Sequence, residues 1–152
     1  MPAAPVTSAA REVLLAFDFG ARRIGVAVGQ TTTGSANAVG TLPARSGKPD
    51  WTAVSACVSA WAPTRLLVGL PYNMDGSDTT TTAACRRFGE ELSRRCQLPV
   101  EFVDERLTSN AAYDELRDAR RSGVRARRIR REDIDANAAR LILDSWLQAH
   151  RG

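Results

Sequence analysis

The hydrophobic pattern of the chain begins with two apolar runs that are separated by a short polar turn. Residues 13–17 (VLLAF) and 24–28 (IGVAV) are almost wholly apolar, and continuous runs of this length are typical of strands buried on both faces. The turn at 20–23 (GARR) is short enough to join them as an antiparallel hairpin. With a third strand predicted near residues 38–42, the chain should begin with three antiparallel strands.

Helices and strands alternate after this hairpin region. A helix is predicted to begin at Asp50 and to end before Pro63. Its apolar face, which we expect in the core, consists of Trp51, Val54, Val58 and Trp61. Residues 65–71 (RLLVGLP) then predict a short buried strand. The next helix, capped by Ser77 or a neighbouring threonine, should have an inner face made of Ala84, Phe88 and Leu92.

The last third of the chain predicts one more strand and two more helices. The strand covers residues 99–103, and a helix follows from about 108 to 121. The final helix should begin at Asp133 or a neighbouring residue, with Asp135 in its first turn. The side chains expected to face one way along this helix are Ile134, Ala138, Leu141 and Ser145.

Together these elements predict an α/β fold. The sheet should be mixed and five-stranded, with three antiparallel strands followed by parallel ones, because the later strands need helical crossovers that place helices on both faces. A chain of 152 residues is long enough to form one domain with its own core. We expect a flexible N-terminal tail at 1–11 and a single domain at 12–150.

The cysteine and histidine content excludes several kinds of site. Cys57, Cys85 and Cys96 form no CxxC pair, and His150 is the only histidine. A zinc site, a Cys/His pair and a Ser/His/Asp triad are therefore not expected, and the cysteines are interpreted as reduced core residues. The start of the chain lacks a signal-peptide pattern and no stretch approaches a membrane span, so we expect a cytoplasmic protein without a membrane partner.

Positive charge is concentrated on arginine. The formal net charge is +4, the pI is about 9.5, and Lys48 is the only lysine. Eight arginines lie between residues 117 and 131, and we expect a mobile basic arm at about 122–132 that follows phosphates. The arginines assigned to it as nucleic-acid ligands are Arg125, Arg127, Arg128, Arg130 and Arg131. The alternative is a solvated surface loop.

Asp18 is the first candidate for chemistry. It follows the apolar run 13–17, where an unpaired carboxylate would cost roughly several kcal/mol, and Gly20 lets another backbone or a ligand approach. A carboxylate in this position suits a divalent metal ion or a phosphate held through one. The alternative is that Asp18 only caps the following turn.

Four segments resemble a known family. They are LLAFDFGARRIGVAVG at 14–29, LLVGLPYNMDGS at 66–77, VDERLTS at 103–109 and DIDANAARLILDSWL at 133–147. In this order and spacing they resemble the YqgF or RuvX family of bacterial RNase H-like nucleases. The resemblance implies an RNase H-like fold, relatedness to the RuvC Holliday junction resolvases, and a role in processing the 5′ end of pre-16S ribosomal RNA.

The resemblance also implies a site. The active-site carboxylates of the family fall on Asp18, Glu105 and Asp135. Three carboxylates at one sheet edge repel one another without a cation, so we expect Mg²⁺ or Mn²⁺, with two ions about 4 Å apart in a two-metal mechanism. Asp104 is the weaker candidate because adjacent strand residues point to opposite faces. For Asp135 alone, a favourable interaction with the helix dipole is the alternative.

Further candidates lie around these carboxylates. Arg22, Arg23 and Arg106 are expected to bind nucleic acid, and the loop containing Asn73 and Asp75 to contact the substrate unless it is only a turn. The chain departs from the family at 29–30, where Gly-Gln replaces the usual Ser-Asp. Any contact made by that acidic residue elsewhere is missing here.

We therefore expect a metal-dependent nuclease acting on structured nucleic acid, with ribosomal RNA precursor favoured as substrate and a monomer as the favoured state. The first alternative is a resolvase of four-way DNA junctions. A nucleotide phosphotransferase is disfavoured because such enzymes close two domains of this kind over the nucleotide. A binding module without catalysis is disfavoured because all three carboxylates are retained.

Overall fold

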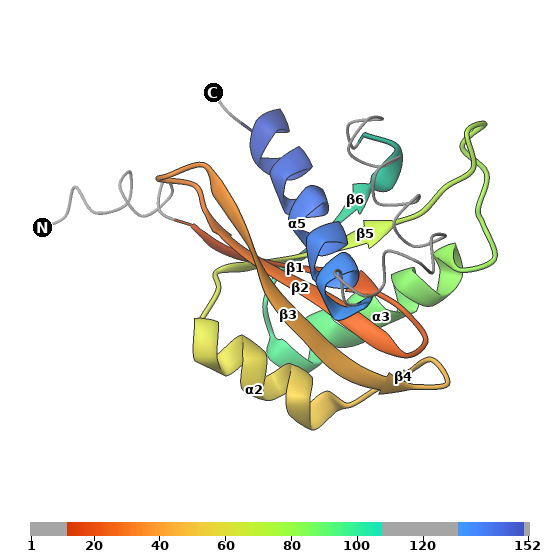
Figure 1. Cartoon of the computed structure of the whole chain (residues 1–152), viewed down its shortest axis with the longest axis horizontal. Coiled ribbons are helices and arrows are strands. Elements are labelled where there is room, and N and C mark those ends of the chain that lie inside the picture. Colours follow the sequence, from red (N-terminus) through yellow and green to blue (C-terminus); the bar gives the residue numbers. More distant parts are fainter. Residues whose placement is uncertain (1–11, 108–130, 151–152) are drawn as a thin grey trace, which may run out of the picture.

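Three antiparallel strands form one half of the sheet in the computed structural model, which describes residues 12–107 and 131–150 (Figure 1). β1 (Val13–Phe19) pairs with β2 (Arg23–Gln30), and β2 pairs with β3 (Ser35–Arg45). A short sixth strand, β4 (Lys48–Pro49), was not predicted and pairs with the end of β3. The turn between them is Ser46 and Gly47, both with positive φ, as two-residue hairpin loops require.

Two parallel strands form the other half. β5 (Arg65–Leu70) lies beside β1 and β6 (Val100–Asp104) beside β5, which gives the strand order β4-β3-β2-β1-β5-β6. The crossovers contain α2 (Trp51–Trp61) and α3 (Thr82–Cys96). The predicted α/β fold with a mixed sheet is confirmed, with β4 as an addition to the five expected strands.

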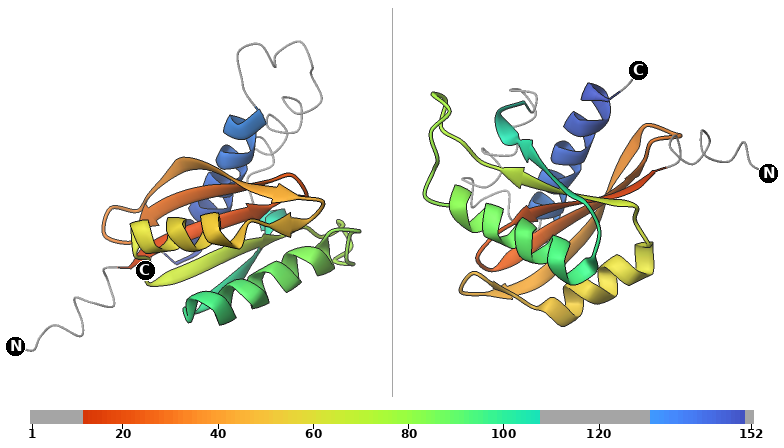
Figure 2. Two further views of the ribbon diagram at one scale, coloured as in Figure 1. Left: turned by 90° about the horizontal axis from the view of Figure 1, so that it is seen from below. Right: turned by 180° about the vertical axis from the view of Figure 1, so that it is seen from behind.

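Helices cover both faces of the sheet, as predicted (Figure 2). Side chains alternate along β1, so that Leu15 and Phe17 pack with the residues of α2 and α3. Leu14 and Ala16 instead pack with α5 (Arg131–Ala149) on the opposite face. None of the helices in the described ranges is long and apolar enough to span a membrane.

The predicted start of α2 is correct, but its apolar face is not wholly in the core. Asp50 caps the helix by accepting a hydrogen bond from the backbone N–H of Ala53 at 3.1 Å. Val54 and Val58 are buried, whereas Trp61 is 43% exposed at the C-terminal end of the helix. Helical spacing predicted that Trp61 would lie on the buried side of the helix. Trp61 is the last residue of α2, however, and the chain leaves the helix there instead of covering it.

The expectations for α3 are partly right. Phe88 and Leu92 are buried, but Cys85 lies more deeply than Ala84. Thr81 occupies the N-cap position without a side-chain capping hydrogen bond, rather than Ser77. The helix expected at 108–121, the tail at 1–11 and the basic arm, apart from the backbone of Arg131 and Glu132, lie outside the described residues.

Ile134, Ala138 and Leu141 lie together on the last helix as predicted, but a different set of its residues packs on the sheet. The residues of α5 that pack on the sheet are Ala139, Ile142, Leu143, Trp146 and Leu147. Ile134 and Ala138 form a separate small cluster with Leu141. Apolar residues occupy more than one side of this helix, so two different stripes satisfied helical periodicity and the larger one packs on the sheet. Because α5 begins at Arg131, Asp135 lies beyond its first turn.

Glycines on one face of the sheet let α5 lie against the strands. A Cβ atom at Gly25 would overlap the carbonyl oxygen of Asp135. A Cβ at Gly29 would lie 2.8 Å from Cδ2 of Leu143, and one at Gly69 would lie 2.5 Å from Cδ1 of Ile142. The position of α5 on the sheet therefore depends on the absence of side chains from these strand residues.

We predict that Gly25→Ala destabilises the protein by about 2–3 kcal/mol, because the new methyl group collides with backbone that cannot move without shifting α5. Urea denaturation should show this loss as a lower midpoint. Gln30→Ala is the matched control, since Gln30 is exposed at the end of the same strand and should change stability by less than about 0.5 kcal/mol. A Gly25→Ala protein as stable as this control would contradict the close contact.

Candidate active site

Asp18 lies near the end of β1 on the face that α5 covers. It stands opposite Gly25 in the β1–β2 register, and it continues the side of the strand that holds Leu14 and Ala16. On the other side, the parallel pairing of β1 with β5 places it one step beyond the Phe17–Val68 pair, next to Gly69. The glycines on both neighbouring strands place no side chain beside this carboxylate, and α5 lies against them.

Glu105 approaches the same place from β6. It is the first residue of the short 3-10 helix η1 (Glu105–Leu107), directly after the strand. A Cβ atom at Gly69 would lie 2.8 Å from Oε2 of Glu105, so the carboxylate reaches over that glycine of β5. Gly69 separates Asp18 from Glu105 on this face of the sheet.

Asp135 is contributed by α5, at the point where that helix touches Gly25. Nε of Arg23 donates a hydrogen bond to Oδ2 of Asp135 at 3.1 Å, and the two form an ion pair. Arg23 is the first residue of β2, so the pair joins the start of that strand to the helix. Both side chains are partly exposed, which leaves them within reach of solvent and of a ligand.

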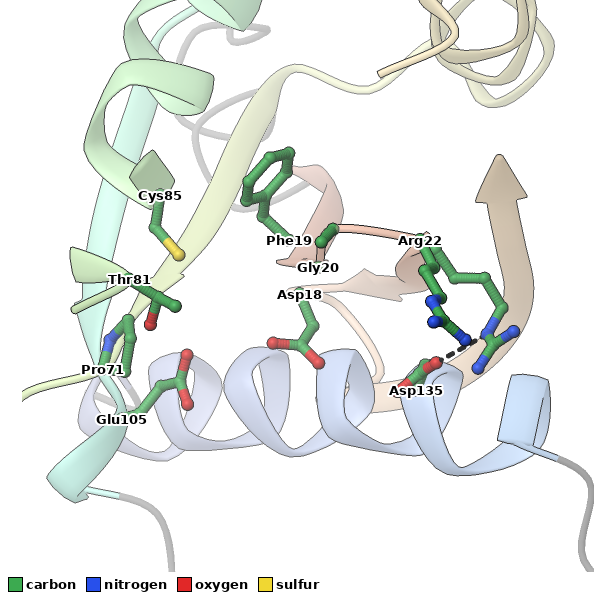
Figure 3. Close-up of a pocket in the computed structure, with 11 residues that line it drawn as sticks. Asp18, Phe19, Gly20, Arg22, Pro71, Thr81, Cys85, Glu105 and Asp135 are labelled. Carbon is green, nitrogen blue, oxygen red and sulfur yellow. Dashed lines mark hydrogen bonds and ion pairs between the residues drawn. The ribbon is translucent and has the colours of Figure 1, made fainter. Parts of the chain in front are cut away.

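The three carboxylates border one cleft of about 480 Å³ (Figure 3). In Figure 3, Asp18 lies between Glu105 on one side and Asp135 on the other. Asp135 is ion-paired with Arg23. The residues that line the cleft are Asp18, Phe19, Gly20, Ala21, Arg22, Arg23, Pro71, Thr81, Cys85, Glu105 and Asp135. Two strand ends and one helix thus bring together residues that are remote in sequence.

The electrostatics of this cleft favour a cation. Burial raises the pKa of the Cys85 thiol to about 12, and the negative charges of Glu105 and then Asp18 contribute to the rise. Carboxylate oxygens are the ligands that Mg²⁺ and Mn²⁺ prefer, so the donor chemistry fits such an ion. Across the described ranges, no three acidic, cysteine or histidine side chains are gathered tightly enough to form a metal site in the arrangement seen. The Arg23 pair holds Asp135 at one end of the cleft.

The predicted arginines have different surroundings. Arg22 and Arg23 line the cleft. Arg106 does not line it, and its guanidinium donates hydrogen bonds to the Asp104 carboxylate and lies 5.4 Å from the centre of the Tyr72 ring. The hydrogen bond from Arg106 is the main cause of a lowered Asp104 pKa. The Asp104 side chain is therefore bound to Arg106 outside the cleft, as its weaker candidacy anticipated.

The loop that contains Asn73 and Asp75 is stabilised by hydrogen bonds within itself. Nδ2 of Asn73 donates to Oγ of Ser77 at 3.0 Å and to the carbonyl of Asp78 at 3.2 Å. Oδ1 of Asp75 accepts from N and Oγ of Ser77, and these bonds lower the Asp75 pKa. Neither residue lines the cleft, so the geometry favours the turn interpretation for this loop.

Three residues at the opposite wall, Pro71, Thr81 and Cys85, were missed by the sequence analysis. They are brought to the cleft by the turn into α3, where the buried hydroxyl of Thr82 donates to the carbonyl of Pro71. The available signal was the run of four threonines at 79–82, which is unusual at a helix start. The arm residues Arg125, Arg127, Arg128 and Arg130 lie outside the described part, as does the side chain of Arg131.

The departure at 29–30 lies far from this site. Gln30 pairs with Val13 at the opposite end of the β1–β2 hairpin from Asp18. A Cβ at Gly29 would lie 2.6 Å from the carbonyl oxygen of Ser35 as well as against Leu143, so the local packing requires glycine there. The replacement changes the support for α5 and leaves the lining of the cleft intact.

Comparisons with known proteins identify the family. A family model described as RuvX, Holliday junction resolvase, matches residues 12–149. The chain belongs to the RuvX family. A relative from Coxiella burnetii named "Putative pre-16S rRNA nuclease" is 47% identical over 139 residues, covering 91% of this chain and 94% of the relative. A relative of the same name from Saccharophagus degradans is 42% identical, with 91% and 95% covered.

Solved structures support the fold of this RuvX family member. The structure of T. thermophilus RuvC in complex with a Holliday junction substrate has a TM-score of 0.53 at 12% identity, covering 91% of this chain and 96% of that chain. The fowlpox virus Holliday junction resolvase has a TM-score of 0.53 at 9% identity, covering 90% and 99%. The predicted RNase H-like fold and the resemblance to RuvX are both confirmed, and a nuclease is the class of enzyme that these comparisons support.

The Asp104–Arg106 pair generates a pH-dependent prediction. Because the folded-state pKa of Asp104 is lowered, the pair stabilises the fold at neutral pH and loses that contribution as pH falls through the lowered pKa. We expect Arg106→Gln to unfold at lower urea concentration than the parent at pH 7. The two midpoints should converge once the pH is below the lowered pKa of Asp104, because the carboxyl is then protonated in both proteins. If the two urea midpoints differed by the same amount at every pH, the Asp104–Arg106 pair would not be the source of the difference.

Proposed function

We propose that the chain is a metal-dependent nuclease that hydrolyses phosphodiester bonds in structured nucleic acid, with the 5′ end of pre-16S ribosomal RNA as its substrate. The observation that carries this proposal is the convergence of Asp18, Glu105 and Asp135 on one cleft. The names of the relatives, which match over almost their whole length, favour the ribosomal substrate. We expect a chain that processes ribosomal RNA to act in the cytoplasm.

In this proposal Asp18, Glu105 and Asp135 hold Mg²⁺ or Mn²⁺. When bound, such an ion supplies an activated water and stabilises negative charge on the scissile phosphate. Asp18 and Glu105 lie on either side of Gly69, and both border the cleft, which has space for a ligand. Asp135 joins them by exchanging its ion pair with Arg23 for the ion. Arg23 is then free to bind a phosphate oxygen beside it.

Nucleic acid is held by the arginines around the cleft. Arg22 and Arg23 border it directly, and both can meet phosphates that approach the carboxylates. The basic arm at about 122–132 extends the contact along the backbone of the substrate, and Arg106 contributes from beside Tyr72. Such contacts position the substrate without selecting its sequence.

The alternative function is a resolvase of four-way DNA junctions, which the description of the family favours. Two coordinated cuts would require a two-fold dimer that presents two sites at a fixed separation. The apolar faces of α2 and α3 are already engaged with the sheet in this chain. We therefore propose a monomer that cuts RNA once, with the junction resolvase as the alternative outcome of the test.

We predict that Asp18→Asn, Glu105→Gln and Asp135→Asn each reduce cleavage on the order of 100-fold or more while the fold is retained, because the three act as one site. Combining two should cost little more than one. Asp104→Asn is the matched control, since its carboxylate is bound to Arg106 outside the cleft, and it should cleave at the parent rate.

The same assay decides the substrate. Labelled 5′ precursor RNA and a four-way DNA junction are incubated with the full chain, with and without Mg²⁺ or Mn²⁺, and the oligomeric state is measured by sedimentation. We expect metal-dependent cutting of the RNA by a monomer. An active Asp18→Asn protein would refute the metal site, and a tight dimer that makes paired nicks in the junction but leaves the RNA intact would establish the resolvase instead.

The arm gives a separate prediction. Replacing Arg125, Arg127, Arg128, Arg130 and Arg131 with glutamine should weaken RNA binding across sequences, because phosphate contacts are lost. The log-log slope of affinity against salt should flatten by about 0.7–0.9 for each lost contact. Titrations at several salt concentrations measure this slope. An unchanged slope would mean that this segment is a solvated loop and that the phosphate contacts lie elsewhere.

A further inference from the structure

A second hollow of about 240 Å³ lies on the face of the sheet opposite the carboxylates. It is formed where β1 ends, the β3–β4 hairpin turns, and α2 and α3 approach the sheet. Its lining consists of Phe19, Gly47, Pro49, Trp51, Ala84, Arg87, Phe88 and Glu91. We call it the aromatic groove.

Three aromatic rings form one wall of the aromatic groove. The rings of Phe19 and Phe88 are stacked with centroids 4.9 Å apart, and those of Trp51 and Phe88 are stacked at 5.6 Å. Phe88 is buried and Arg95 lies 4.5 Å from the centre of the Trp51 ring, whereas Phe19 is only partly buried and keeps ring surface at the hollow. Exposed aromatic surface of this kind stacks with the flat face of any nucleobase.

The charges around the aromatic groove favour an anionic ligand. Arg87 is exposed and has no ion-pair partner within the described residues, and Arg45 and Lys48 are exposed on the adjacent hairpin. The one acidic lining residue, Glu91, forms ion pairs with Arg94 and Arg95. Its charge is therefore offset, and the surroundings of the groove remain positive.

The groove and the cleft share one lining residue at the end of β1. Phe19 lines both hollows, and it follows Asp18 on β1, so the two side chains point to opposite faces of the sheet at its end. The backbone N–H of Gly47 donates to the carbonyl of Ala21 at 3.0 Å, which fixes the β3–β4 hairpin beside the turn after β1. A nucleic-acid strand that has one phosphate at Asp18 therefore needs to extend only past Phe19 for its next nucleotide to reach the groove.

We propose that the aromatic groove binds one unpaired base of the nucleic acid, next to the nucleotide whose phosphate lies in the cleft. The proposal rests on the proposed nuclease function and names the kind of substrate: a single-stranded flank, as at the end of an RNA precursor. A volume of about 240 Å³ is below the ~300–1,000 Å³ of pockets that enclose whole small ligands, and it suits a single base. A base-paired nucleotide would first have to break its pairing and stacking, at a cost of roughly a few kcal/mol, so an unpaired base is favoured.

The test fills the groove and measures binding without cleavage. All proteins are full-length and carry Asp18→Asn, so that the RNA stays intact. Ala84→Leu places a larger side chain in the groove, and Ala83→Leu is the matched control, being the adjacent, exposed alanine of α3 that does not line it. The probes are an RNA hairpin with an unpaired flank that contains 2-aminopurine and the same hairpin with a blunt end.

We expect the Asp18→Asn parent and the Ala83→Leu protein to prefer the flanked hairpin by about fivefold or more, with quenching of 2-aminopurine as it stacks. Ala84→Leu should abolish both the preference and the quenching. Arg87→Gln, an exposed change that the fold tolerates, should reduce the preference at least about twofold. These results can hold even if the chain cuts nothing, so a failure of the proposed function is seen separately in the cleavage assay.

Two results would overturn the proposal. One is equal affinity of the parent for the flanked and blunt hairpins. The other is an Ala84→Leu protein that is folded by circular dichroism and still quenches 2-aminopurine. Either result would mean that the aromatic groove is only a gap between α3 and the β3–β4 hairpin.

Discussion

Contact between the backbones of α5 and β2 at Gly25 determines the geometry of the candidate active site. The helix touches the strand at Asp135, and the strand residue there stands opposite Asp18 in the β1–β2 register. One close approach therefore brings two of the three carboxylates to the same region. Gly29 and Gly69 extend the contact along the sheet, so the helix lies closer to it than ordinary side chains would allow.

Because side chains alternate along the strands, the carboxylates of the cleft and the large aromatic residues of the strands lie on opposite faces of the sheet. On the α5 face, Asp18 and Glu105 border the cleft, whereas strand residues such as Leu14 and Leu67 pack under the helix. On the other face large apolar residues such as Phe17 and Phe88 fill the layer under α2 and α3. The end of β1 joins these environments, because its last two residues, Asp18 and Phe19, belong to different faces.

Local sequence patterns were sufficient for five of the six strands and for the unusual position of Asp18, since an apolar run that ends in a carboxylate has few structural explanations. They did not predict that β6 ends at Asp104 and that Glu105 begins a 3-10 helix. The packed face of α5 could not be predicted, because more than one side of that helix is apolar and only the sheet decides between them. The ion pair of Arg23 with Asp135 joins residues 112 positions apart and leaves no local signal.

The main chain connects two of the candidate carboxylates through the segment that is proposed to bind nucleic acid. The basic stretch of arginines lies in the sequence between Glu105 and Asp135. One continuous segment of main chain therefore joins these two candidate ligands and carries the arginines proposed to bind nucleic acid. An insertion or deletion in this segment therefore changes the covalent connection between Glu105 and Asp135, even where no residue of the cleft is altered.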